Sequence, residues 1–220
     1  MMLKFAPQLI NLFATLILLL SFAMISQRRI VSLVNLFMIQ GAALVATSFL
    51  LAYVTNQPDL YVSGALTLML KVVLIPWMLH RMIRKLNVRW DVETLLNVPT
   101  TMLVGIALVI FSFSLALPVS RLSDSIAGGS LGIALACVFL SFMMMITRSK
   151  AIPQVIGFLS MENGLIFAAT TVTNGMPMIV EFGIALDVLV GVLILGVFMF
   201  QIREKFDSLD ISNLETLKED

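Results

Sequence analysis

The sequence predicts an all-α membrane protein, a bundle of about seven transmembrane helices with the N-terminus outside and the C-terminus inside. Composition, the length of the apolar stretches and the distribution of basic residues all point this way. Of the 220 residues, 60% are hydrophobic and only 12% are charged. Soluble domains are nearer half apolar and a quarter charged. The mean hydropathy of +1.03 agrees, so lipid is the expected solvent for most of the chain.

Seven apolar stretches are long enough to cross a bilayer, which takes about 20 residues in a helix. Helices are expected because lipid offers the backbone no hydrogen-bond partners. The first stretch lacks a small-residue cleavage site before its basic end, so it reads as a retained helix and not as a signal peptide. The expected spans are residues 3–26, 31–55, 60–83, 97–117, 127–147, 152–173 and 177–202.

Polar or helix-breaking residues separate these spans. Pro153 and Pro177 fall at helix starts, where proline is tolerated. Trp77 and Trp90 are expected as anchors at a membrane interface. The breaks include residues 27–29, 56–59, 120–124 followed by 128–129, and 174–175, and the longest polar pieces are residues 84–96 and the tail from Arg203.

Basic residues give the orientation, because they concentrate on the cytoplasmic side of membrane proteins. The opposite side holds only Lys4 and Arg121, and Lys71 lies within a span. This alternation requires an odd number of crossings. The predicted inner side holds 11 basic residues: Arg28, Arg29, Arg81, Arg84, Lys85, Arg89, Arg148, Lys150, Arg203, Lys205 and Lys218.

The expected organisation is four N-terminal helices in residues 1–120, a three-helix region in 121–203 and a cytoplasmic tail in 204–220. The tail is either a solvated terminus or an amphipathic strap for a cytoplasmic partner. Cys137 is the only cysteine, so the chain can form neither an internal disulfide nor an iron–sulfur site. No phosphate-binding loop or metal motif occurs. The sequence predicts no catalytic residue, cofactor, metal or nucleic-acid partner.

Apart from Lys4 and Arg81 at the ends of their spans, four acidic or basic side chains fall inside the spans, where charges are costly and usually face a bundle interior or a wet cavity. Depth follows from counting residues to the nearest inner basic residue, at ~1.5 Å per residue. Lys71 is then roughly 15 Å deep and Glu162 roughly 18 Å, both near the midplane. Asp187, at roughly 24 Å, lies farther out, and Glu181, at roughly 33 Å, reaches the far edge.

Two interpretations of Lys71 and Glu162 remain open. They can form a fixed ion pair that only orients two helices. Alternatively they can relay protons or ions, because a medium of low dielectric constant favours the neutral forms of both groups. Asp187 and Glu181 are further candidates for such a pathway. For Glu181, the alternative is an acid favoured by the dipole of its own helix.

Polar and helix-bending residues near Lys71 extend the candidate site. Pro76 can kink the helix and form a hydrated hinge, or the kink can simply be packed by neighbours. His80, the only histidine, is either a structural interface residue or a proton-entry group. Asn35 and Gln40 are expected to hydrogen-bond between helices.

The last three spans resemble the K-type small subunit of respiratory complex I. The similar segments are Arg148 to Lys150, Gly157 to Gly164 and Leu186 to Gly191. With four helices in front, and with Lys71 to Trp77, the whole chain resembles the family of hydrogenase-4 membrane component E. The match departs from the K-type pattern in two ways, since Leu159 stands where a glutamate is usual and Asp187 replaces a glutamate. Glu162 lies one turn after Leu159, on the same face.

The resemblance implies a non-catalytic subunit of a membrane-bound NiFe hydrogenase or complex I-like oxidoreductase, in the inner membrane of a bacterium or archaeon. Its implied role is a mid-membrane proton or cation pathway and assembly of the complex, with Glu162 and Asp187 on the polar axis. Implied partners are antiporter-like and quinone-module-like membrane subunits and a peripheral hydrogenase arm. The alternative is a subunit of a multisubunit cation/proton antiporter or a stand-alone transporter.

Overall fold

The computed structural model describes residues 2–86, 97–120 and 127–172, together with the single residues 185, 189, 191, 192 and 196. Nearly all of these residues are helical. The elements are α1 (Met2–Ser26), α2 (Ile30–Thr55), α3 (Pro58–Thr67), the π-helical segment η1 (Leu68–Leu74), α4 (Ile75–Leu86), α5 (Val98–Ser120), α6 (Ala127–Thr147) and α7 (Ala151–Val172).

Six helical segments of the described chain are long and apolar enough to cross a membrane. The third is the continuous run of α3, η1 and α4, whose apolar part covers Pro58–Arg81. These six agree with the first six expected spans to within a few residues at each end. The seventh expected span, residues 177–202, lies outside the described residues except for isolated positions, as do Glu181 and Asp187.

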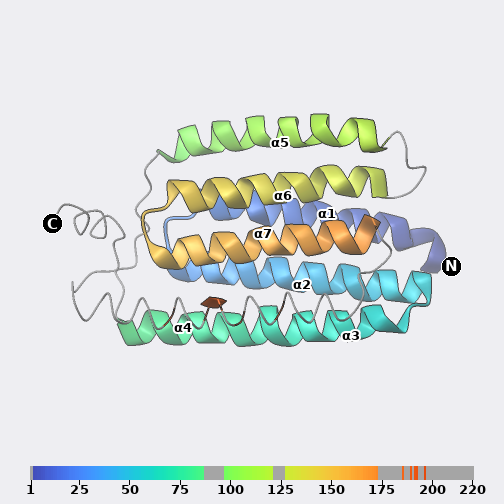
Figure 1. The fold of residues 1–220 in the computed structure, drawn as a ribbon, viewed down its shortest axis with the longest axis horizontal. Helices are drawn as coiled ribbons and strands as arrows, with labels where there is room; N and C mark the ends of the chain where they lie inside the picture. The colour runs from blue at the N-terminus through green and yellow to red at the C-terminus, as the bar shows by residue number, and fades with distance from the viewer. Residues whose placement is uncertain are drawn as a thin grey trace.

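The helices run lengthwise along one another (Figure 1). Helices α1, α2, α6 and α7 contact one another and form the centre of the bundle. Helix α5 packs against α6 on one side, and the run from α3 to α4 packs against α2 on the other. The largest buried cluster joins Phe37 of α2, Leu79 of α4, Leu140 of α6 and Leu159 of α7. This core packs α2 against α7, and both of these helices carry part of the candidate site.

The inner basic residues gather at one end of the bundle. Helices α1, α4 and α6 all end at the left of Figure 1, where α7 begins. Arg28, Arg81 and Lys150 lie at or next to these helix ends. The basic turns of the described chain therefore share one end, as the charge distribution predicts.

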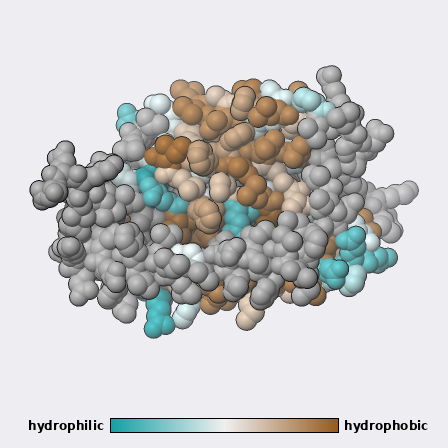
Figure 2. Space-filling model, in the orientation of Figure 1, coloured by the Kyte–Doolittle hydropathy of each residue, from teal (hydrophilic) through white to brown (hydrophobic). Residues whose placement is uncertain are grey.

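Large apolar side chains cover the outside of the bundle. Met69 of η1 is 69% exposed and Leu103 of α5 is 68% exposed. Brown, apolar atoms dominate the described middle part of the face in Figure 2. Such extensive apolar exposure is typical of a surface that contacts lipid or other membrane subunits.

Candidate functional site

Lys71 and Glu162 form a buried ion pair between η1 and α7. The ammonium Nζ lies 3.1 Å from the carboxylate Oε1. Lys71 is 1% exposed and Glu162 is 5% exposed, although nearly a hundred residues separate them in the chain. The similar membrane depths estimated for the two residues from the sequence predict this contact.

A chain of polar side chains extends the pair across the bundle. Lys71 Nζ also donates to Oδ1 of Asn163, at 3.2 Å. The Nδ2 of Asn163 donates to Oε1 of Gln40 at 3.1 Å, and Nε2 of Gln40 donates to Oγ of Ser21 at 2.7 Å. Ser21 Oγ in turn donates to the carbonyl of Ile17. Four helical segments, η1, α7, α2 and α1, thus meet through one hydrogen-bonded network.

The π-helical segment positions Lys71 within this network. In η1 the backbone hydrogen bonds reach five residues back along the chain. One example is the bond from the N–H of Ile75 to the carbonyl of Leu70. Pro76 follows immediately and has no N–H to donate to a carbonyl of the preceding turn. π-helical turns are rare and occur frequently at functional sites. Here the turn places a buried lysine at its centre.

Glycines bring the backbones of the site close together. A Cβ on Gly41 of α2 would lie 3.3 Å from Val72 Cγ2 and 3.8 Å from the carbonyl oxygen of Lys71. On α7, a Cβ on Gly164 would lie 3.2 Å from Cys137 Cβ. Gly41 therefore lets α2 approach η1, and Gly164 lets α7 approach α6 directly beside Asn163.

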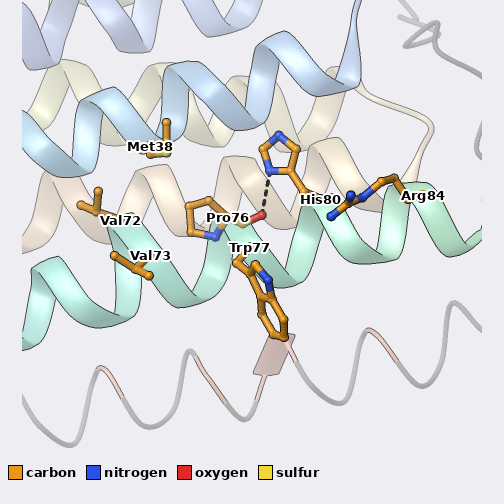
Figure 3. A pocket seen from close by; sticks show the side chains of 7 residues that line it. All are labelled: Met38, Val72, Val73, Pro76, Trp77, His80 and Arg84. Atoms are coloured by element: carbon orange, nitrogen blue, oxygen red, sulfur yellow. Dashed lines mark hydrogen bonds between the residues drawn. The ribbon is translucent and has the colours of Figure 1, made fainter.

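His80 lies apart from the ion pair. Nine residues separate it from Lys71, which is roughly 13 Å along a helix. Its Nδ1 is 2.8 Å from the carbonyl oxygen of Pro76. Because a carbonyl only accepts, Nδ1 is the donor in this contact. The half-buried His80 and the exposed Arg84 line one end of an open groove of about 530 Å³ (Figure 3). The other walls of this groove are mostly apolar.

Trp77 and Asn35 both point outward. Trp77 is 52% exposed, and the guanidinium of Arg81 lies 5.3 Å from the centre of its ring. The expected location of Trp77 at a membrane interface stays a prediction. Asn35 is exposed and makes no interhelical bond within the described residues, whereas Gln40 makes the expected one. Trp90 lies outside the described residues.

Arg148 is a buried residue that the sequence assigns to the solvated inner side. Its Nη2 donates to the carbonyl of Ile25 at 2.6 Å, in the last turn of α1. The side chain of Gln154 donates to the backbone carbonyl of Arg148. Burial, and secondarily the charge of Arg28, lowers the pKa of Arg148 to about 10, so it stays protonated at neutral pH. For a basic residue directly after a helix, the sequence does not indicate whether the side chain points into the bundle or into solvent.

The site has the parts that proton exchange requires. A carboxylate and an ammonium within hydrogen-bonding distance can exchange a proton without moving. The amides of Asn163 and Gln40 hold the lysine and connect it to Ser21. Among the residues described by the structure, no three His, Cys, Asp or Glu side chains cluster as a metal site would require. The sequence singled out Lys71, Glu162 and Gln40, but it did not assign roles to Asn163 and Ser21.

Comparison with known proteins gives the family. The chain is 31% identical to the uncharacterized protein Rv0085 of Mycobacterium tuberculosis over 194 residues, which cover 88% of each chain. The chain belongs to the same family as Rv0085. No family model matches, and no solved structure matches.

A second relative of the chain carries the name of a hydrogenase component. Hydrogenase-4 component E of Escherichia coli is 23% identical over 210 residues, 96% of this chain and 97% of that protein. The protein of the same name from Shigella flexneri has the same identity and coverage. The likeness to component E is distant but spans nearly the full length of both chains, and it agrees with the resemblance to component E found in the sequence, whereas the resemblance to the K-type subunit stays a prediction.

Proposed function

We propose that the chain is a non-catalytic, multi-pass subunit of a membrane-bound NiFe hydrogenase or complex I-like oxidoreductase in a bacterial or archaeal inner membrane. Its role is to contribute to assembly and to a mid-membrane proton or cation pathway. The contact between Lys71 and Glu162, buried in the middle of the spans, carries the proposal. The distant likeness to hydrogenase-4 component E supports membership of a multisubunit complex.

The chemistry of the pair favours a relay. When the ammonium of Lys71 gives a proton to Glu162, both side chains become neutral without leaving their positions. This matters in a membrane, because neutralisation removes the cost of holding two charges away from water. A nearby charge in a partner subunit would shift this balance and so switch the relay.

The other candidate residues take roles around this pair. Asp187 would continue the pathway outward, and Glu181 would lie at its outer end. Ala185, two residues before Asp187 in the sequence, lines a small cavity together with Lys71. His80 would serve proton entry at the basic end of the bundle. The partners are antiporter-like and quinone-module-like membrane subunits and a peripheral hydrogenase arm.

The test uses the whole complex purified with variant subunits and reconstituted in liposomes. We expect Lys71→Met and Glu162→Gln to reduce proton translocation per turnover by about 100-fold or more, the low end for loss of a proton-transfer group, while the complex assembles. Proton uptake followed with a pH-sensitive dye measures the effect. Arg29→Met and Asp59→Asn, which remove exposed charges of the same types, should leave translocation unchanged.

The exchange of the two residues separates a relay from a fixed pair. The double variant Lys71→Glu/Glu162→Lys keeps an ion pair but reverses the positions of acid and base relative to Asn163. A relay should remain impaired in this variant. Recovery of translocation by the exchange, or normal translocation in both single variants, would reject the relay.

A further inference from the structure

A small enclosed cavity lies beside Lys71 between α3, η1 and α7. Its volume is about 10 Å³, roughly the space that a single water molecule needs for its centre. The residues around it are Ser63, Leu66, Thr67, Leu70, Lys71, Ile166 and Ala185. Three of these, Ser63, Thr67 and Lys71, carry hydrogen-bonding side chains, so the cavity is not a purely apolar void.

The two hydroxyl groups at this cavity differ from most helical hydroxyl groups of the described bundle. Helical serines and threonines in apolar surroundings usually donate to a carbonyl of the preceding turn. Thr47 and Ser48 of α2 do so. In the part of the chain that the structure describes, the side chains of Ser63 and Thr67 have no such bond, although Ser63 is buried. Buried polar groups without a protein partner are commonly satisfied by an ordered water molecule.

Lys71 has a donor to spare for the same cavity. An ammonium group has three N–H donors and no acceptor. Within the described residues, two partners receive bonds from Nζ, Glu162 and Asn163, and both belong to α7. Ser63 and Thr67 lie about two turns and one turn before Lys71, on α3. Within the described residues Nζ makes no bond to either hydroxyl, and a molecule in the space between them would give the third donor an acceptor.

We propose that the cavity is a binding site for one water molecule, held by Lys71, Thr67 and Ser63. The water accepts from the ammonium and donates to a hydroxyl, which gives it the two or more polar partners that a buried water needs. This site makes Lys71 a branch point. One branch leads to Glu162 on α7, and the other leads through water and hydroxyls along α3, away from the basic end of the bundle.

The inference rests on the proposed proton pathway and adds a direction to it. A lysine that has lost its proton to Glu162 must regain one from another source. Water and hydroxyl groups pass protons along hydrogen bonds, whereas the amides of Asn163 and Gln40 mainly hold geometry. The water site would therefore reload Lys71 from the α3 side.

The test fills the cavity from a residue outside the network. Ala185→Val adds two methyl groups to a wall of the cavity without altering Lys71, Glu162 or either hydroxyl. In an intact complex determined at high resolution in lipid, we expect density for one water within hydrogen-bonding distance of Lys71 Nζ, and none in the variant. We also expect a several-fold loss of proton translocation with catalysis retained.

Matched variants separate dehydration from misfolding. Gly191→Ala adds a methyl group where no atom of the described residues lies within 4 Å, so it should leave both measurements unchanged. Thr67→Val keeps the shape of the side chain but removes the hydroxyl, and Thr67→Ser restores it, so the first should impair translocation and the second should rescue it.

The outcomes for the water site and for the pathway are distinguishable. An empty cavity in the native complex, or normal translocation in both Ala185→Val and Thr67→Val, overturns the water site. If Lys71→Met still impairs translocation in that case, the proposed function stands without it. If Lys71→Met and Glu162→Gln are also normal, the pathway itself falls.

Discussion

Asn163 is the residue on which the buried network depends. It accepts from Lys71 and donates to Gln40, so it joins two otherwise separate polar groups. Both neighbours are buried away from bulk water, so each loses a partner when the amide is removed. A buried polar group that loses its partner costs about 1–3 kcal/mol.

Replacing the amide tests this dependence. We expect Asn163→Leu to lower the stability of the subunit by about 1–3 kcal/mol, because Gln40 loses its donor and Lys71 one acceptor. Unfolding in detergent micelles measures the change. Asn35→Leu removes an exposed amide from α2 and should be nearly neutral. The double variant Asn163→Leu/Gln40→Leu should lose less than the sum of the two single variants, and strict additivity would show that the two amides are not coupled.

At this scale the sequence indicates some partners and hides others. Lys71 and Glu162 could be paired in advance because charges in apolar spans are rare and their depths can be counted. Asn163 could not, because an amide tolerates several neighbours, and only the rotation of α7 decides which neighbour it meets. Arg148 was assigned to solvent for a similar reason, since its direction depends on how α1 packs against α6.

Among the described elements, the run from α3 to α4 differs from the other helices because it contains a π-helical segment. The π-helical turn at η1 separates two α-helical parts and places Lys71 against α2 and α7. The spans themselves follow from hydropathy, and their predicted ends lie within a few residues of the observed ones. The π-helical turn does not follow from hydropathy, because it changes the hydrogen-bond register and leaves the apolar pattern of the helix intact.

The close approach of α2 to η1 gives a prediction for Gly41. Gly41→Leu would force a side chain against Val72 and the Lys71 backbone, and overpacking of this kind costs about 1–3 kcal/mol. We expect lower stability and weaker proton translocation together, since Lys71 would move away from Glu162. Gly41→Ala should have a smaller effect on both, because only Val72 must shift slightly. A fully stable, fully active Gly41→Leu variant would show that the approach is not required.

For the whole molecule, the shared position of the basic turns predicts the orientation in the membrane. The ends of α1, α4 and α6 lie together, and the turn between α2 and α3 lies at the opposite end. Basic residues favour the cytoplasmic side, so the turn at Asn56 should be outside and Ser149 inside.

Reporter insertion checks this orientation. Alkaline phosphatase inserted after Asn56 should be active, because it folds outside, whereas the same enzyme inserted after Ser149 should be inactive. A fluorescent protein fused after Asp220 should fluoresce if the C-terminus is inside, as seven crossings require. The opposite pattern at the two turns would reverse the assignment, and a C-terminus outside would mean an even number of crossings.

Cys137 gives the chain a practical property. It is the only cysteine in the sequence, and its side chain is fully buried where α6 packs against α7. Maleimide reagents that act from either aqueous compartment therefore have no native target to reach. Single cysteines can be introduced at chosen positions without first removing the native one, and their labelling rates would map which residues face water, lipid or a partner in the assembled complex.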